Sequence, residues 1–351
     1  MRLRKLPYFI AVLVSLGLIV VCVIVSFNLY QDYGRKRLNE YTLRPEGPDV
    51  EALAERLPEV SKIEFTELLD GQIFYQGNVY EYNQNLLTFL ILGIDDEVGV
   101  EKIPGTAGQA DLIMLLVLDD EAKTLKIINI SRDIMTRIEK YDTSGFYIGE
   151  EEMQIALQYA YGDGMEKSAR LMEETVSNLF YGIPIHGFGA VGMPSIATLN
   201  DAVDGVEVTI IEDMSFIFPS LYLGNTVNLM GDEAFVYVQY RDTKVAESNH
   251  LRNIRQKQYL LGFFQSVKDK TKSNFTFPLK LYGLGKDHAV TSITADQAAY
   301  LSTAVLGCKL TEEDMMSVAG EVISSGELEE FYVAEELLYD LIIKVFYKMQ
   351  K

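Results

Sequence analysis

Three apolar runs decide the fold of this chain: LTFLILG at residues 87–93, LIMLLVL at residues 112–118 and LKIINIS at residues 125–131. Runs of this length with few polar interruptions are typical of strands that are covered on both faces. A short polar connection at residues 119–124 joins the second run to the third and favours an antiparallel pair. A longer segment, residues 94–110, separates the first run from the second. We therefore expect an α/β fold with these strands in the middle of a layered domain.

The rest of the chain combines a predicted hairpin with amphipathic helical patterns. Residues 73–76 and 79–82 predict the hairpin, with a turn at Gly77-Asn78, because alternating β-formers flank a Gly-Asn pair. Thr294 predicts the N-cap of a helix that runs to residue 306. Other helices are expected around residues 50–57 and at residues 151–161, 165–180, 194–203, 231–240, 251–270 and 333–349, with a strand at 206–211 and a loop at 242–250.

Composition and charge argue against several classes of function. The chain has 351 residues, 48% hydrophobic and 23% charged, with a formal net charge of -20. This is an ordinary globular composition, but so acidic a protein without a basic face or tail is not expected to bind nucleic acid. The two cysteines, Cys22 and Cys308, and three dispersed histidines argue against an intrachain disulfide and a zinc site. A serine-hydrolase triad is also unsupported, because no G-x-S-x-G motif occurs.

The N-terminal segment predicts a membrane anchor. Residues 7–30 carry no charge, and a helix of that length rising ~1.5 Å per residue would span a hydrocarbon core about 30 Å thick. Arg2, Arg4 and Lys5 precede it, so the positive-inside rule places the N-terminus in the cytoplasm and the rest outside the cell. A cleaved signal peptide is disfavoured by the length of the apolar run. The expected organisation is a cytoplasmic tail at residues 1–6, a single transmembrane helix at 7–30, an extracellular stem with the hairpin at 31–86, and one domain at 87–351.

Charged side chains stand at the ends of the three predicted strands. Asp95 follows the first strand, Asp111 precedes the second and Arg132 follows the third. Neighbouring strands would bring these groups to one edge of the sheet, a usual place for ligands in α/β folds. Carboxylates together with phosphate oxygens are a typical way to hold Mg²⁺. The alternative is that the aspartates are solvated residues of strand-end turns.

More arginines lie at the ends of other hydrophobic segments. Arg241 follows the helix predicted at 231–240, and Arg252, Arg255 and Gln256 lie on the helix predicted at 251–270. Arg252 and Gln256 are four residues apart and share a helix face. Guanidinium groups offer planar, permanently charged donors to phosphate oxygens, so these arginines suggest one local anion site in an acidic protein. Ordinary surface ion pairs are the alternative.

Residues 87–258 resemble the LytR-CpsA-Psr family of cell-envelope proteins, because weak motifs occur in a specific order behind a single anchor. These motifs are Gly93-Ile94-Asp95, Asp111-Leu112-Ile113-Met114, Ile130-Ser131-Arg132-Asp133, Ala160-Tyr161-Gly162, Ile183-Pro184-Ile185 with Phe188, Val203-Asp204-Gly205-Val206, Asn228-Leu229 with Gly231, Ala234 and Tyr237, then Tyr240-Arg241 and Arg252-x-x-Arg255-Gln256.

The resemblance implies a single α-β-α sandwich around a mixed central sheet, and an external enzyme. Such enzymes transfer a glycan phosphate from a polyprenyl-pyrophosphate carrier to peptidoglycan, assisted by Mg²⁺, with the lipid in an apolar pocket between sheet and helices. The implied catalytic residues are Asp95, Asp111, Arg132 and Arg241; the first two would hold the metal, and Asp95 is the candidate base. The implied pyrophosphate-binding residues are Arg132, Arg241, Arg252, Arg255, Gln256, Gln109 and Gln239.

The chain departs from the family pattern at charged positions. Gln109 and Gln239 stand where the family usually has arginine, Glu97 stands where arginine is frequent, and Asn249 replaces an acidic residue. An amide can donate a hydrogen bond but cannot offset phosphate charge, and each lost charge-assisted contact costs ~1.5–3 kcal/mol. Two functions therefore stay open: an active phosphotransferase, or a non-catalytic relative that binds a polyprenyl lipid or wall glycan as a scaffold or regulator.

Overall fold

The computed structural model describes residues 26–38, 40, 71–96, 98–192, 195–241, 248–274, 276–286, 289–325 and 328–350. Most of the membrane segment predicted at residues 7–30 lies outside these ranges. The short helix predicted around residues 50–57 and most of the loop predicted at 242–250 also lie outside them. Within the described ranges, no helix combines the length and apolarity that crossing a membrane requires.

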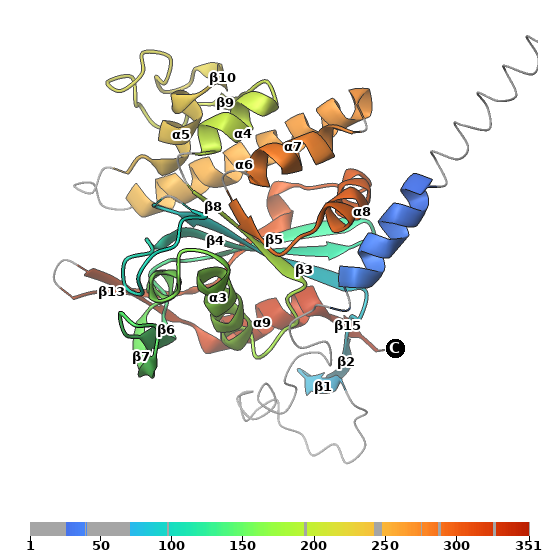
Figure 1. The fold of residues 1–351 in the computed structure, drawn as a ribbon, viewed down its shortest axis with the longest axis vertical. Coiled ribbons are helices and arrows are strands. Elements are labelled where there is room, and N and C mark those ends of the chain that lie inside the picture. Colours follow the sequence, from blue (N-terminus) through green and yellow to red (C-terminus); the bar gives the residue numbers. More distant parts are fainter. Residues whose placement is uncertain are drawn as a thin grey trace, which may run out of the picture.

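A mixed six-stranded sheet forms the centre of the molecule, in the order β11-β8-β3-β4-β5-β12 (Figure 1). The three apolar runs form its middle strands, each antiparallel to the next: β3 (Leu86–Ile94), β4 (Ala110–Asp119) and β5 (Thr124–Ile130). The outer strands are β8 (Gly187–Gly192), parallel to β3, β11 (Ala289–Thr291), antiparallel to β8, and β12 (Met315–Ser317), parallel to β5. The predicted mixed α/β fold with these strands in its middle is confirmed.

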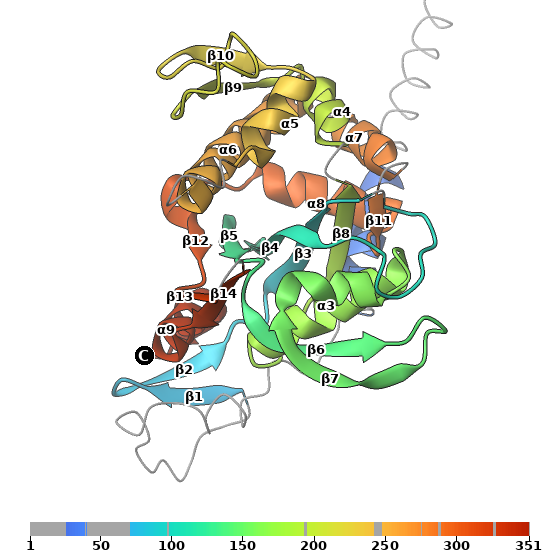
Figure 2. The same cartoon turned by 90° about the vertical axis from the view of Figure 1, so that its left-hand side faces the viewer.

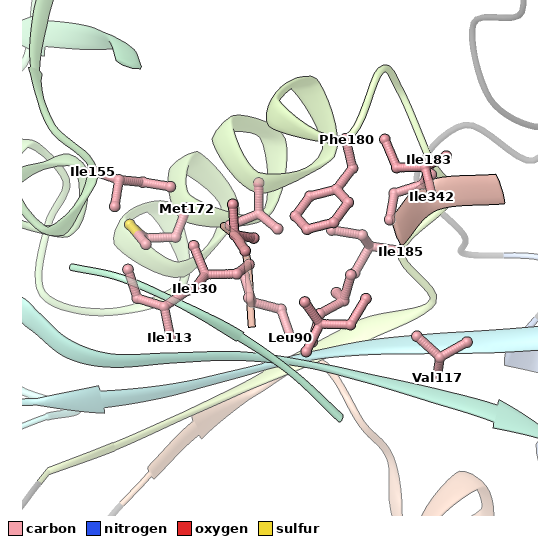
Figure 3. Packing of buried hydrophobic residues seen from close by; sticks show 14 of the residues in the cluster. Leu90, Ile113, Val117, Ile130, Ile155, Met172, Phe180, Ile183, Ile185 and Ile342 are labelled. Atoms are coloured by element: carbon pink, nitrogen blue, oxygen red, sulfur yellow. The ribbon is translucent and has the colours of Figure 1, made fainter. Parts of the chain in front are cut away.

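One face of the sheet packs against α3 (Glu166–Leu179) and α9 (Glu335–Phe346). Leu90 and Ile113 point from the strands toward Met172 of α3 and form part of the largest core cluster (Figure 3). Leu90, Ile113 and Met172 are fully buried, and burying one such side chain contributes roughly 1.5–3 kcal/mol. Both helices had been predicted, although the second ends at Phe346 and not at residue 349.

The opposite face packs against α6 (Ser248–Ser273) and α8 (Ala295–Leu306) (Figure 2). Met114, the neighbour of Ile113 on β4, points to this side and contacts the cluster that contains Leu260 of α6. Adjacent strand residues thus serve opposite faces, which explains the unbroken apolar runs. The helix α8 begins after Thr294 as predicted, and the Thr294 N–H donates to Gln297 Oε1 at 2.9 Å.

A smaller layer lies over α6 and completes that side of the molecule (Figure 2). Its core joins Val206, Leu229 and Tyr237 to Tyr259 of α6. Its elements are α4 (Ile196–Ala202), β9 (Val206–Thr209), β10 (Thr226–Leu229) and α5 (Asp232–Gln239). The helix that follows α6, α7 (Phe277–Lys286), packs beside them. The predicted helices at 194–203 and 231–240 and the strand at 206–211 therefore exist, with small shifts at their ends.

A helix at residues 26–38 packs directly on the start of α8. Gly34 lies close to the backbone of Asp296, because a Cβ built at this position would lie 2.2 Å from the Asp296 carbonyl oxygen. Leu38 is fully buried in the cluster that also contains Tyr300 of α8. Only glycine permits this approach, so the helix is fixed on the domain.

The prediction of a helix at residues 151–161 is wrong for its first four residues. Residues Tyr147–Gln154 form strand β7, which pairs antiparallel with β6 (Met135–Tyr141), and only Ile155–Tyr161 are helical, as the 3-10 helix η2. The pairing of β7 with β6 is a tertiary interaction that overrides local helical propensity. A second hairpin, β13 (Gly320–Ser325) with β14 (Leu328–Val333), was not predicted.

The N-terminal hairpin has the predicted strands but a shifted turn. The strands are β1 (Gln72–Tyr75) and β2 (Asn78–Tyr82), and the turn residues are Gln76 and Gly77, with φ of 45° and 85°. Two positive φ values are characteristic of the type I′ turn that suits a two-residue hairpin. The hairpin, which had been assigned to the stem, contributes Ile73 to the main core and pairs through β2 with β15 (Tyr347–Met349).

Candidate functional site

The ends of the central strands meet at one edge of the sheet, as their order requires. Ile94 at the end of β3 pairs with Ala110 at the start of β4, and Ile113 pairs with Ile130 at the end of β5. This register places Asp95, Asp111 and Arg132 at the same edge. The structure therefore brings together the strand-end charges that the sequence predicted.

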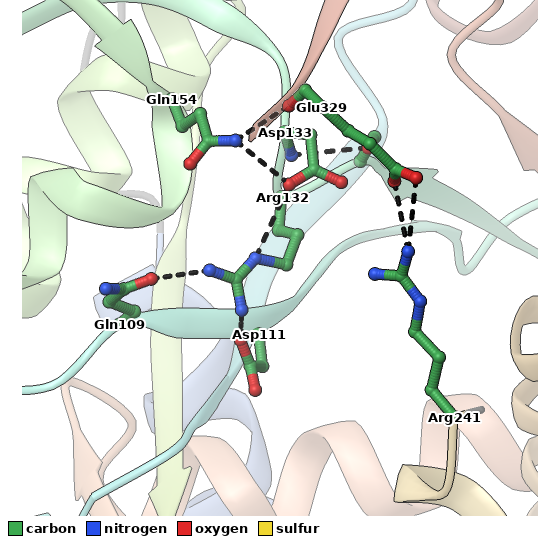
Figure 4. Close-up of polar contacts among 8 residues, drawn as sticks. Gln109, Asp111, Arg132, Asp133, Gln154, Arg241 and Glu329 are labelled. Atoms are coloured by element: carbon green, nitrogen blue, oxygen red, sulfur yellow. Dashed lines mark hydrogen bonds and ion pairs between the residues drawn. The ribbon is translucent and has the colours of Figure 1, made fainter. Parts of the chain in front are cut away.

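Arg132 is the centre of this group (Figure 4). Its Nη1 forms a close ion pair with Asp111 Oδ1, and its Nη2 donates to Gln109 Oε1 at 2.5 Å. Its Nε lies 3.6 Å from Asp133 Oδ1. The guanidinium is thus oriented from three sides while about a quarter of its side chain remains exposed, at 24%. Gln109, which replaces an expected arginine, acts here as an acceptor that positions Arg132.

Asp95 holds the loop that carries Gln109. The Gln109 N–H donates to Asp95 Oδ1 at 2.6 Å, and the Asp95 N–H donates to the Gln109 carbonyl at 3.1 Å. Gly108 makes this close approach possible, since it has a φ of +78° and a Cβ there would lie 2.8 Å from Asp95 Oδ1. Lys102 adds a salt bridge to Asp96 at 3.0 Å. Asp95 and Asp111 therefore lie on either side of Gln109 in the chain and at the same edge in space.

Arg241 reaches the group from beyond the end of α5. Its Nη2 lies 3.2 Å from both carboxylate oxygens of Glu329, which is on β14 (Figure 4). Gln154 links Asp133, beside Arg132, to Glu329, beside Arg241, because its Nε2 donates to Asp133 Oδ1 at 3.2 Å and to the Glu329 carbonyl at 2.8 Å. Arg241, which was expected to bind phosphate, is thus paired with a carboxylate of the protein itself, that of Glu329.

Glu329, Gln154 and Asp133 were not predicted as site residues. Asp133 was visible in the Ser131-Arg132-Asp133 motif, beside the predicted Arg132. Burial raises the pKa of the Asp133 carboxyl, and the adjacent Arg132 opposes that effect. Glu329 and Gln154 belong to hairpins that carry no recognisable motif, so no local signal identified them.

The residues of α6 fall into two groups. Arg252 and Gln256 line a small polar pocket together with Asp111, Arg132 and Asp133. Burial lowers the pKa of Arg252, and the positive charges of Arg241 and Arg132 lower it further. The charges of the three guanidinium groups therefore act on one another at this pocket, where the carboxylates of Asp111 and Asp133 offset part of them.

Arg255 lies outside this pocket, although it had been predicted to bind pyrophosphate. Its side chain is only 1% exposed, its Nε donates to the Tyr237 carbonyl at 2.8 Å, and its terminal nitrogens contact the Tyr240 carbonyl and Glu212. These carbonyls lie at the end of α5, where a cation is stabilising. Gln239, the last residue of α5, is exposed, and in the described part of the chain no hydrogen bond joins it to the arginine group.

An apolar pocket of about 200 Å³ adjoins the polar one. It lies between β3 and β4 of the sheet and the helices α4, α5 and α6, with Ile91, Met114, Val238 and Phe263 in its walls. Leu112 and Gln256 line both pockets, so the two spaces meet there. The arrangement suits an amphiphile whose anionic head contacts the arginines and whose apolar tail lies between sheet and helices.

The fold and site define a mixed α/β protein with an apolar pocket that opens onto an arginine cluster. The chain belongs to the LytR_cpsA_psr family, whose sequence model matches residues 60–332. It is 24% identical over 260 residues to the polyisoprenyl-teichoic acid–peptidoglycan teichoic acid transferase TagU of Bacillus cereus, covering 74% of this chain and 78% of that protein. It is also 24% identical over 263 residues to the TagV transferase of Bacillus subtilis, covering 73% of this chain but only 62% of that relative.

Solved structures show the same fold at low identity. The crystal structure of B. subtilis TagV is 22% identical with a TM-score of 0.57, and the match covers 75% of this chain and 97% of that one. The structure described as TagT bound to LI-WTA is 18% identical with a TM-score of 0.55, covering 75% and 90% of the two chains.

We expect the substitution Glu329→Gln to tighten binding of inorganic pyrophosphate by about two- to five-fold, because an exposed ion pair is worth up to ~1 kcal/mol. The carboxylate competes with phosphate for Arg241, whereas the amide carries no charge. The measurement is isothermal titration of the full-length protein in detergent.

The matched control is Glu330→Gln, which removes the same charge from the next residue of β14. Glu330 accepts a hydrogen bond from Tyr332 at 2.9 Å, and alternation along the strand points it to the opposite face. Equal or weaker pyrophosphate binding in Glu329→Gln than in this control would contradict competition at Arg241.

Proposed function

We propose that this protein is a phosphotransferase that attaches polyprenyl-pyrophosphate-linked glycan polymers to peptidoglycan during cell-wall assembly. The observation that carries the proposal is the junction of the two pockets at Leu112 and Gln256, which accommodates a lipid next to its phosphate group. Family membership and the teichoic acid transferase names of the relatives from B. cereus and B. subtilis support it.

In this proposal, the arginines bind the pyrophosphate of the donor. Arg132 is already oriented by Asp111 and Gln109, while Arg252 lines the same pocket and adds a second positive charge. Arg241 becomes available when phosphate displaces Glu329. The side chains of Arg241 and Glu329 are 27% and 40% exposed, and an ion pair open to solvent is weak, so exchange for phosphate is feasible. Positioning and charge neutralisation of this kind are the main requirements of phosphoryl transfer.

Gln109, where the family resemblance led us to expect an arginine, adds no positive charge to the site. Among the described residues, this group contains Arg132, Arg241 and Arg252 together with Asp111, Asp133 and Glu329, and Asp95 lies nearby, against the Gln109 backbone. This group alone carries no excess positive charge with which to bind a polyanion. A divalent cation would supply it, and carboxylates that share a site with phosphate oxygens suit Mg²⁺.

Asp95 and Asp111 are the residues that would hold Mg²⁺ in the proposed enzyme. Bound there, the ion would neutralise charge on the phosphate oxygens. Asp111 would bind the ion while it remains paired with Arg132, and Asp95 would bind it while it accepts the hydrogen bond from the Gln109 N–H. The Asp95 carboxylate remains the proposed acceptor for the proton of the attacking hydroxyl, and Asp133, whose pKa is raised by burial, is a second group suited to that task.

We expect Mg²⁺ to tighten pyrophosphate binding to the full-length protein by about ten-fold or more, and Asp95→Asn to remove most of that gain. The experiment is a calorimetric titration with and without Mg²⁺. Because Mg²⁺ also binds pyrophosphate in solution, the decisive comparison is between variants. Asp269→Asn, an exposed position on α6 paired with Lys272, is the control. A full Mg²⁺ effect in Asp95→Asn would exclude that residue as a metal ligand.

We expect Arg132→Ala to reduce release of polyprenyl phosphate from a lipid-linked glycan by about 10²–10³-fold, as loss of one preorganised charge-stabilising donor typically does. Release is followed with full-length protein, Mg²⁺ and peptidoglycan acceptor. Arg35→Ala, an exposed arginine beside Tyr300, is the control. Donor binding without release by the natural chain would instead support the non-catalytic lipid-binding relative.

We also propose that residues 7–30 anchor the protein in the cell membrane by a single pass, with the N-terminus in the cytoplasm and the domain outside. The uncharged segment and the preceding Arg2, Arg4 and Lys5 support this topology. Protease added to intact cells, after the wall is made permeable, should digest the domain and leave an N-terminal tag intact. Protection of the domain until the membrane is lysed would overturn the topology.

A further inference from the structure

A groove of about 640 Å³ lies on the α3 and α9 side of the sheet, away from the apolar pocket. Its walls come from the β6–β7 hairpin, from α3 with Tyr181, and from β14 with the start of α9. We call it the hairpin groove and define it by Arg137, Glu139, Glu150, Glu152, Tyr181 and Tyr332. Its volume is in the range of known ligand sites, and neither the arginine group nor the apolar pocket uses it.

The hairpin groove is connected to the arginine site by one face of the β6–β7 hairpin. Arg137 is paired with Glu152 and Glu139 with Glu150, so these four side chains share a face. The next pair along the same face is Met135 with Gln154. Gln154 is the residue that donates to Asp133 and to the Glu329 carbonyl. A ligand in the groove would therefore extend toward the groups around Arg132.

The lining carries an excess of negative charge. Besides Glu139, Glu150 and Glu152, it contains Glu174 and Glu335, so five glutamates face a single arginine, Arg137. In the described part of the chain, the side chains of Glu150, Glu152 and Glu174 form no hydrogen bond or ion pair. Glu139 and Glu150 oppose each other directly, an arrangement of like charges that destabilises a strand pair. A polyanion is therefore repelled, which disfavours this groove as a site for an anionic donor polymer.

The remaining groups suit a ligand rich in hydroxyls. Ionised carboxylates accept hydrogen bonds and do not donate them, so they pair with hydroxyl or ammonium donors. Asn178 adds an amide, and Tyr181 and Tyr332 add aromatic rings with polar tips. The Tyr181 hydroxyl is itself held by Glu335, which fixes the ring at the end of α3. Carboxylates, amides and tyrosine rings together match the alternating polar and apolar surfaces of a sugar chain.

We propose that the hairpin groove binds the uncharged sugar backbone of the acceptor glycan strand and leads its reacting hydroxyl toward Asp133 and Arg132. The proposal rests on the proposed transferase function. It assigns the donor and the acceptor to opposite sides of the sheet, with the lipid pocket on the α6 side and the acceptor on the α3 side. The two substrates then meet at the end of β5.

The test measures acceptor binding without any donor. The chain has no tryptophan, so Tyr332→Trp places a single tryptophan at the groove, and its emission can be followed apart from that of the tyrosines. Soluble, uncrosslinked peptidoglycan strands are titrated into the full-length protein carrying this reporter. We expect a saturable change in emission, and about ten-fold or more weaker binding when Glu150→Ala and Glu152→Ala remove two charged acceptors. Poly(glycerol phosphate), an anionic polymer, should produce no saturable change.

The matched control is Glu151→Ala. Glu151 lies between the two tested residues but on the other face of β7, where it pairs with Lys140 at 2.6 Å. Binding of peptidoglycan strands should change less than two-fold in this control. Isothermal titration of the same strands into the protein with Tyr332 intact checks that the reporter does not create the signal.

Pyrophosphate affinity, measured on every variant, separates this proposal from the proposed function. Unchanged pyrophosphate binding with weakened strand binding supports an acceptor site distinct from the donor site. Strand binding that survives the Glu150→Ala and Glu152→Ala pair, or equal binding of poly(glycerol phosphate), overturns the groove assignment. If pyrophosphate does not bind even the natural chain, the transferase function fails, whereas the strand titration still decides whether the groove binds glycan.

Discussion

The ion pair between Arg132 and Asp111 at the edge of the central sheet is the interaction on which the site depends. Asp111 lies on β4 and Arg132 follows the end of β5, so their positions follow from the register of these two core strands. Gln109 and Asp133 then orient the guanidinium from two further directions. Removing any one of these groups would leave a partly buried charge with fewer partners, so the cluster is stable only as a set.

The site carries its own anions, and this changes how binding should be described. In the proposed enzyme, a phosphate would have to exchange with Glu329 at Arg241 and share Arg132 with Asp111. Gln109, at a position where arginine was expected, contacts Arg132 without adding a positive charge. Affinity for the donor is therefore a difference between two sets of ionic contacts, which makes it sensitive to salt and to divalent cations.

The parts of the fold that local pattern determines were predictable. The strands β3, β4 and β5 were evident because burial on both faces demands unbroken apolar runs, and α3 and α8 because their spacing and N-cap are local signals. Residues 151–154 were misassigned because three consecutive glutamates have no strand pattern of their own and adopt one only by pairing with β6.

The site was predictable to a similar extent. Asp95, Asp111 and Arg132 follow from strand order alone. Glu329 does not, because its place depends on β14 running beside the start of β6, where Ile134 bridges Phe331. The sequence also could not distinguish Arg252 from Arg255, since both occur on one polar turn of α6 and only packing decides that Arg255 faces the end of α5.

The contact of Gly34 with Asp296 gives the proposed anchor a mechanical property. A flexible tether would let the domain sample many heights and tilts above a bilayer, and each productive encounter would cost orientational entropy. Here the close approach of Gly34 and the buried Leu38 hold the helix at residues 26–38 against α8, so in the proposed topology it would act as a short, stiff connection. The reach of the domain is then set by the geometry of that joint, and enlarging Gly34 would change the angle at which the protein stands.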